Sequence, residues 1–110
     1  MILSAHQPAY IPWAGYIHKI ISSDLFIILD NVQYEKNSFI NRNYLLINNE
    51  PKLITVPVEL KSHFNTKIND IKISNTKQWG RKHLKTIQLN YKKSPYFYKH
   101  IDFFEEIYNE

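Results

Sequence analysis

One stretch near the N-terminus, His6–Lys19, constrains the fold of this 110-residue chain more than any other. An apolar segment, Met1–Ala5, precedes it. Apolar residues then recur at helical spacing, at Trp13, Ile17, Ile20 and Ile21. The pattern predicts a strand, a loop and a helix that begins at Ile11 or Pro12 and ends at Ser22. Proline suits the first helical position, because the N–H that it lacks has no partner there.

A second apolar run, Leu25–Leu29, follows the predicted helix. Its short, continuous apolarity is typical of a parallel strand that is buried on both faces. Strand, helix and strand in this order predict a βαβ unit, the start of a Rossmann-like α/β fold. His6 and Gln7 leave the first strand, and Asp30 and Asn31 leave the second. We expect these residues to meet the helix N-terminus at one sheet edge, where open α/β sheets bind ligands.

The middle of the chain predicts a β-hairpin. Residues Val32–Ile40 are irregular or contain a short strand, whereas Tyr44–Ile47 and Leu53–Val58 are rich in strand-forming residues. The segment between these two strands, Asn48–Pro51, consists of turn residues. Pro57 marks the end or the edge of a strand, because it cannot donate a ladder hydrogen bond.

A surface loop and a short strand follow the hairpin. The loop spans Glu59–Asn69 and contains His63 and Phe64, and Ile71–Ile73 alternates as a short strand does. The part before this segment and the part after it are expected to form a single α/β domain over residues 1–110.

The C-terminal part predicts two helices. Asn75 or Thr76 can cap the first, and Ser94 with Pro95 can begin the second, Tyr96–Tyr108. The expected apolar faces are Trp79, His83, Ile87 and Tyr91 in the first helix and Phe97, Ile101, Phe104 and Tyr108 in the second. His83 is expected at the edge of the core.

Composition excludes several classes of site. The chain has no cysteine, so disulfides, thiol catalysis and cysteine-based zinc sites are ruled out. With only two glycines it has no glycine-rich phosphate loop, and its histidines lack metal-ligand spacing, so no metal site is expected. The N-terminus lacks the pattern of a signal peptide, and no run is long enough to span a bilayer. We therefore expect a cytoplasmic protein.

The net charge of +4 is unevenly distributed. No acidic residue lies between Asp70 and Asp102, whereas eight basic residues do: Lys72, Lys77, Arg81, Lys82, Lys85, Lys92, Lys93 and Lys99. Such a face can attract nucleic acid, which makes a nucleic-acid-binding module an alternative. The favoured interpretation is a solvated helix face, because the aromatic residues of this region fit a core stripe.

The motif His6-Gln7-Pro8-x-Tyr10-x-Pro12-Trp13-x-Gly15-Tyr16 resembles the WbqC-like protein family. Further matches are Lys19, Ser23-Asp24-x-Phe26, Asp30-x-Val32-Gln33-Tyr34, Lys36, Asn41-Arg42-Asn43, Thr55-Val56-Pro57-Val58, Trp79 and Tyr91-x-x-x-Pro95-Tyr96-Phe97. The match is dense in the first half and sparse in the second. Family members are generally longer, so the chain resembles the N-terminal part of a member, or a short member. It departs from the family at Glu50–Ile54, where a glycine and a tryptophan are usual.

The resemblance implies a role in bacterial polysaccharide or O-antigen biosynthesis, with transfer of glycine or another acyl group to a sugar or sugar nucleotide. The βαβ start is also similar to that of the HIGH-type nucleotidyltransferases, although their histidine pair is absent. The expected partner is a small molecule that bears phosphate or carboxylate, rather than a nucleic acid. The cofactor stays open, a homo-oligomer is compatible with the pattern, and an inactive half-domain that binds a protein partner is a further alternative.

Nine residues are candidates for the site. His6 and Asp30 are the proposed catalytic pair, because imidazole exchanges protons near neutral pH and a carboxylate can orient it. Arg42 can clamp a phosphate or carboxylate through its planar fork, or form an ion pair at the sheet edge. The predicted substrate-binding residues are Gln7, Tyr10, Trp13, Lys19, Gln33, Asn41 and Arg42. For two of them a structural role is the favoured interpretation: Trp13 as a wall of the core and Lys19 as a surface side chain.

Overall fold

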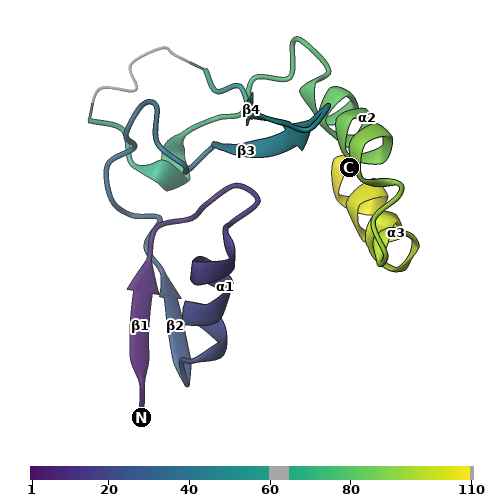
Figure 1. Ribbon diagram of the computed structural model, residues 1–110. Coiled ribbons are helices and arrows are strands. Elements are labelled where there is room, and N and C mark those ends of the chain that lie inside the picture. The colour runs from purple at the N-terminus through teal and green to yellow at the C-terminus, as the bar shows by residue number, and fades with distance from the viewer. Residues whose placement is uncertain (60–64, 110) are drawn as a thin grey trace.

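The computed structural model describes residues 1–59 and 65–109, which form a mixed α/β fold (Figure 1). Its elements are β1 (Leu3–His6), α1 (Ala14–Ile21), β2 (Leu25–Ile28), β3 (Arg42–Ile47), β4 (Glu50–Thr55), a 3-10 turn (Ile68–Asp70), α2 (Trp79–Tyr91) and α3 (Phe97–Tyr108). Figure 1 shows β1, β2 and α1 as one layered unit, with the β3–β4 hairpin beyond the carboxyl ends of the strands and α2–α3 at the end of the hairpin. Among the described helices, none has the length and apolar character needed to cross a membrane.

The predicted βαβ unit is confirmed. β1 and β2 pair in parallel, from Leu3 opposite Leu25 to His6 opposite Ile28. The turn after α1 is tied to β1, because the Asp24 carboxylate accepts the Ile2 N–H at 2.6 Å. Within the described residues the parallel sheet has only these two strands, so a mixed α/β architecture is established and a Rossmann-like sheet is not.

The expectation that the second strand is buried on both faces is wrong. Leu25 is 50% exposed, Ile27 41% and Ile28 59%. α1 covers one face of the pair, where Tyr16 packs edge-to-face on Phe26 with ring centroids 5.6 Å apart. In the described part of the chain no second layer covers the opposite face.

The first helix begins later than expected. Pro12 is not the first helical residue, because Trp13 is still extended and Ala14 opens the helix. The preceding residue, Ile11, has a left-handed backbone with φ 45°. The side-chain amide of Asn43 donates to the Ile11 carbonyl at 2.6 Å and fixes this turn. With the turn held by this tertiary hydrogen bond, the helix begins two or three residues later than expected.

The predicted hairpin is confirmed as an antiparallel β3–β4 pair, but its turn is shorter than expected. Asn48 and Asn49 alone form the turn, both with positive φ (53° and 63°), as two-residue hairpins require. Pro51 therefore lies inside β4, opposite Leu46. Pro57 follows the end of β4, as expected.

Part of the predicted surface loop, including His63 and Phe64, lies outside the described residues. The described remainder contains the 3-10 turn and an isolated bridge between Gln33 and Lys67. The expected short strand Ile71–Ile73 is reduced to one isolated bridge, between Ile73 and Val58.

The two C-terminal helices are confirmed, but neither cap is as expected. α2 follows Gln78, which has a left-handed φ of 48°, and the side chain of Asn75 instead accepts from Trp79 Nε1 at 3.2 Å. α3 begins at Phe97, after the Ser94-Pro95 turn. The predicted apolar faces form the core, in which Leu84 and Ile87 of α2 pack with Ile101 of α3. Ile11, Leu45, Phe97, Phe104 and Tyr108 surround this cluster.

Candidate functional site

His6 lies at the carboxyl end of β1 and contacts Lys19 of α1. The Lys19 Nζ is 3.3 Å from His6 Nδ1 and donates to the Ala5 carbonyl at 2.7 Å. An ammonium group can only donate, so Nδ1 must accept. The proton of the neutral imidazole is therefore on Nε2, which remains as a hydrogen-bond donor.

Two aromatic rings enclose the His6 imidazole. Trp13 and Tyr16 meet it edge-to-face, with centroid distances of 5.8 and 4.9 Å. The Tyr16 hydroxyl donates to the Gln7 carbonyl at 2.9 Å, so the backbone of Gln7 is part of this arrangement. A Cβ on Gly15 would lie 3.2 Å from Trp13 Cδ1, so glycine allows the indole to lie against the start of α1. The sequence motif thus supplies the two aromatic side chains that pack against His6.

Asp30 and Gln33 follow β2, but the structure does not join either to His6. The β2 end does reach His6, since the Leu29 N–H donates to the His6 carbonyl at 2.8 Å. The Asp30 carbonyl accepts from the Asn69 N–H at 2.9 Å, and its carboxylate is exposed. Within the described residues, no contact of His6 involves Asp30. The catalytic role of Asp30 and the binding role of Gln33 stay predictions.

Arg42 lines a separate pocket of about 280 Å³ beside the hairpin. Its Nη2 donates to the Asn37 carbonyl at 2.5 Å, whereas its buried Nε has no hydrogen-bond partner among the described residues. Lys36 adds a second cationic side chain. The lining residues are Tyr34, Lys36, Asn37, Asn41, Arg42, Thr55, Val56, Pro57 and Val58, and no carboxylate is among them. The lining therefore favours an anion.

Asn41 shapes the wall of the Arg42 pocket. Its Nδ2 donates to the Val56 carbonyl at 2.9 Å, and its Oδ1 accepts from the Tyr34 hydroxyl at 3.1 Å. Burial raises the pKa of Tyr34, although the bond to Asn41 and the charge of Arg42 act in the opposite direction. Both ends of the Asn41 amide thus serve the fold, so direct substrate binding by this residue stays a prediction.

Tyr10 does not contact His6. It holds the loop of residues 7–13 between β1 and α1, here called the motif loop, against the C-terminal helices. Its hydroxyl is 2.7 Å from Nδ1 of His83 in α2 and also hydrogen-bonds the hydroxyl of Tyr108 in α3. Burial lowers the pKa of His83, partly offset by a hydrogen bond to the Thr55 backbone. Burial and the contact with Tyr108 raise the pKa of Tyr10. This neutral, buried network confirms His83 as a core-edge residue.

Sequence reasoning missed the part that Asn43 and Tyr108 play in placing the loop. Asn43 donates to the carbonyls of both Tyr10 and Ile11, at 3.3 and 2.6 Å. The sequence offered two signals for this role: the polar amide of Asn43 beside Arg42, and Tyr108 on the apolar stripe of the last helix. Neither signal identifies the partner, because 33 and 98 residues separate these side chains from Tyr10.

The motif loop and the Arg42 pocket share a wall. A second cavity, of about 320 Å³, includes Pro8, Ala9 and Tyr10 in its lining. It has Tyr34, Asn41, Val56 and Val58 in common with the Arg42 pocket. The motif loop and the Arg42 pocket are therefore connected only through these shared lining residues. Among the described residues, no direct contact joins Arg42 to His6.

Comparison with known proteins decides the family. Residues 7–110 match the WbqC-like protein family. The chain belongs to this family. A relative in Mycobacterium tuberculosis (strain ATCC 25618 / H37Rv), the uncharacterized protein Rv1507c, is 38% identical over 104 residues, which is 94% of this chain and 45% of that protein. No solved structure matches the chain. The resemblance seen in the His6–Tyr16 motif is therefore confirmed, and this WbqC-like chain spans less than half the length of that relative.

Proposed function

We propose that this WbqC-like chain is part of an acyl or aminoacyl transferase and that it binds a small molecule bearing phosphate or carboxylate. The acceptor would be a sugar or sugar nucleotide in bacterial polysaccharide or O-antigen biosynthesis, in the cytoplasm. The observation that carries the proposal is the contact of Lys19 with His6 Nδ1 at the carboxyl ends of the parallel strands. This is the edge at which α/β sheets bind ligands.

In this proposal His6 acts first as a donor. Because Lys19 holds Nδ1 as an acceptor, the Nε2–H can donate to an anionic oxygen of the ligand. It can pass its proton to a leaving group if Nδ1 takes a proton from the Lys19 ammonium in the same step, which leaves a neutral imidazole and a neutral amine. Lys19 adds positive charge beside the ring. The Trp13 and Tyr16 rings limit the motion of the imidazole and so reduce the cost of orienting it.

Arg42 supplies the second anchor. The Arg42 guanidinium and the nearby Lys36 suit a phosphate or carboxylate that enters the 280 Å³ pocket. The His6 region and the Arg42 pocket would then bind different parts of one extended ligand, which would pass over the residues that separate them. Asp30, exposed after β2, would meet a sugar hydroxyl rather than His6 itself.

The experiment is isothermal titration of the chain with ATP and with UDP-glucose. Arg42→Ala should weaken binding by about 1.5–3 kcal/mol, as loss of a charge-assisted hydrogen bond does. His6→Ala should weaken binding as well, and where turnover is measurable it should lower the rate by roughly 10²–10⁴-fold. His18→Ala and Arg81→Ala are matched controls at exposed positions, and circular dichroism checks folding. Unchanged binding in both site variants would refute the proposal.

The nucleic-acid alternative has less support. The basic side chains of α2 are exposed, but of the three aromatic residues that would stack on bases, Trp79 and Tyr91 are engaged within the fold and, in the described part of the chain, only Tyr96 is free of such contacts, at 70% exposure. Trp79 packs edge-to-face on His83 at 5.4 Å, and the Tyr91 hydroxyl accepts from the Leu46 N–H at 2.9 Å. We therefore expect weak, steeply salt-dependent binding of single-stranded RNA. Submicromolar binding at physiological salt, lost in Arg81→Ala with Lys85→Ala, would reverse this ranking.

A further inference from the structure

Three exposed aromatic side chains lead away from His6 across the surface. Trp13 is 44% exposed, Phe39 44% and Tyr44 55%. The ring of Trp13, which packs on His6, lies 6.2 Å from the ring of Phe39, and the Phe39 ring lies 6.3 Å from that of Tyr44, measured between centroids. These three residues are here called the aromatic row. A contiguous exposed patch of this kind marks a binding surface, whereas single exposed apolar residues are ordinary.

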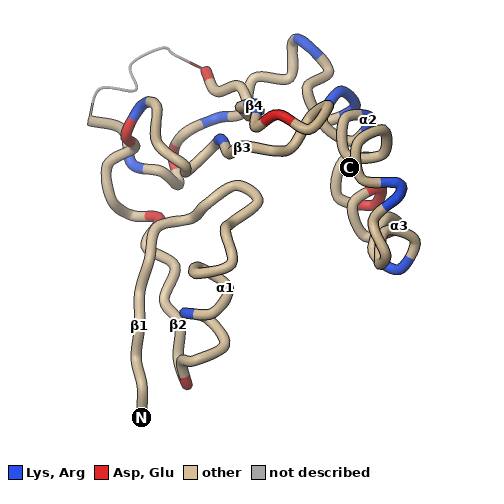
Figure 2. The backbone as a smooth tube through the Cα atoms, viewed as in Figure 1, with Lys and Arg blue, Asp and Glu red and all other residues tan. Residues whose placement is uncertain are grey.

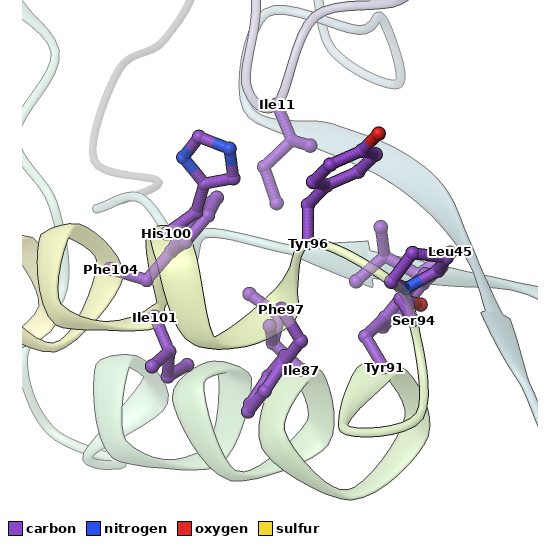
Figure 3. Close-up of a pocket in the computed structure, with 11 residues that line it drawn as sticks. Ile11, Leu45, Ile87, Tyr91, Ser94, Tyr96, Phe97, His100, Ile101 and Phe104 are labelled. Carbon is purple, nitrogen blue, oxygen red and sulfur yellow. The ribbon is translucent and has the colours of Figure 1, made fainter.

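The two segments that carry the aromatic row are tied to each other. The Tyr10 N–H donates to the Phe39 carbonyl at 3.2 Å, and Asn43, the residue before Tyr44, donates to the Ile11 carbonyl. Ile11 in turn packs against the core and lines an apolar cavity of about 350 Å³ together with side chains of α2 and α3 (Figure 3). The rings are therefore held in position before a ligand arrives, which lowers the cost of binding.

The aromatic row itself is uncharged. Figure 2 shows the loop between β1 and α1 without acidic or basic positions. Cationic side chains lie at the two ends of the row: Lys19 contacts His6, and Arg42 is two residues before Tyr44, on the same face of β3. Phosphate or carboxylate groups would thus be bound at the ends of the row, and the row suits a neutral group between them.

The rings combine apolar faces with polar edges. Within the described part of the chain, Trp13 Nε1 and the Tyr44 hydroxyl have no hydrogen-bond partner, so both can bind a ligand hydroxyl. The face of an aromatic ring is negative and attracts weakly positive C–H groups. A pyranose has an apolar C–H face and hydroxyl groups around its edge, so it is complementary to such a ring. Three rings in succession fit several consecutive sugars better than a single sugar.

We propose that the aromatic row binds an oligosaccharide, with consecutive sugar rings on Trp13, Phe39 and Tyr44. The proposal rests on the proposed function, because it takes the acceptor to be a sugar. It adds that this acceptor is a chain of sugars, whose end lies beside His6 and whose next rings extend along the hairpin.

The first test is isothermal titration of the whole chain with mono-, di- and trisaccharides of the maltose, cellulose and chitin series. We expect saturable binding in at least one series. Each added sugar should tighten binding roughly 2- to 10-fold, as one further aromatic contact does. No saturable binding in any series, or an affinity that does not rise with length, would overturn the proposal.

Variants locate the site on the row. Phe39→Ala and Tyr44→Ala should each weaken trisaccharide binding roughly 2- to 10-fold, whereas Tyr44→Phe, which keeps the ring, should lose less. Tyr96→Ala and Tyr98→Ala are matched controls, because these tyrosines are 70% and 80% exposed and lie outside the row. Circular dichroism checks the folding of each variant. An equal loss in the controls, or unchanged binding in folded Phe39→Ala and Tyr44→Ala, would contradict the assignment.

ATP separates this inference from the proposed function. Phe39→Ala should bind ATP as the wild type does, because the phosphates are bound by charged groups at the ends of the row. If ATP binding depends on Arg42 and no saccharide binds, the proposed function stands and the oligosaccharide assignment is wrong. If a trisaccharide binds through the row but neither ATP nor UDP-glucose binds, the anion site is wrong and the row assignment stands.

Two further results would identify another occupant. Weaker ATP binding in Phe39→Ala, without saccharide binding to the wild type, would show that the row stacks on a nucleobase. Sedimentation tests a second copy of the chain. If no saccharide binds and Phe39→Ala converts an oligomer to a monomer, a second copy covers the row. Either result would overturn the oligosaccharide assignment.

Discussion

At the scale of single residues, the motif loop is held by side chains that lie far from it in the sequence. Tyr10 is fixed by His83 and Tyr108, and the carbonyls of Tyr10 and Ile11 are fixed by Asn43. These contacts satisfy polar groups inside a mostly apolar region, where an unpaired group would be costly. The loop that carries His6 is therefore positioned by both the hairpin and the C-terminal helices.

The buried histidine predicts a pH dependence of stability. Burial holds the folded-state pKa of His83 below its ordinary value of 6.5. The unfolded chain thus takes up a proton more readily, so the stabilising contribution is complete above pH 6.5 and is lost as the pH falls through the folded-state pKa. We expect the free energy of unfolding, measured by urea denaturation, to fall over this range. His83→Asn should flatten the curve, and the exposed His18→Asn should leave it unchanged.

Asn43 offers a test of the loop brace. Asn43→Asp keeps the acceptor that bonds the Tyr44 N–H, now at 2.7 Å, but removes the donor to the two loop carbonyls. We expect a loss of about 1–3 kcal/mol in unfolding free energy, the range for two hydrogen bonds. Trp13 fluorescence should change as well, because the loop leads into that residue. A variant as stable as the wild type would show that Asn43 does not hold the loop.

At the scale of elements, the sequence predicted the three α-helices of the described residues and the hairpin, and hydrogen bonds to side chains changed the ends of these elements. It did not predict the 3-10 turn Ile68–Asp70. Pro12 suits the first helical position, and Asn75 and Ser94 suit the cap, yet none of the three takes that place. Asn75 is taken by Trp79 Nε1, and the turn at Ile11 is set by Asn43. Local propensity gives the type of an element, but such competing partners are invisible without the fold.

The hairpin turn gives a prediction at this scale. Asn49 has φ 63°, which a β-branched residue adopts poorly. Asn49→Val should lower the unfolding free energy by about 1–2 kcal/mol. Asn49→Gly should keep or increase it, because glycine has no penalty at positive φ. Equal stability of the two variants in thermal denaturation would rule out the two-residue turn.

At the scale of the whole molecule, the sequence allowed the parallel pair and the family to be predicted, but not the grouping of the candidate residues. His6 and Lys19 share one βαβ unit, so their approach follows from local topology. Arg42 lies on the hairpin, whose position depends on contacts with the loop and with α2. No local pattern encodes such contacts, and so the position of Arg42 relative to His6 could not be derived from the sequence.

The uncovered face of the parallel pair predicts self-association. Leu3, Leu25 and Ile27 are all more than 40% exposed on the sheet. Apolar patches of this kind favour burial against another surface. We expect a concentration-dependent increase in mass by sedimentation, reduced by Ile27→Lys and unaffected by Lys52→Ala on the hairpin. A monomer at high concentration would contradict this expectation.

The account depends most on His6 as a donor at a ligand-binding edge, and nitrogen NMR of its side chain tests this claim directly. At a pH where the imidazole is neutral, we predict a proton on Nε2 and none on Nδ1, because Lys19 donates to Nδ1. Titration with ATP or UDP-glucose should shift the His6 Nε2 resonance saturably and leave that of His18 in place. A proton on Nδ1, or an Nε2 resonance that neither ligand moves, would contradict the account.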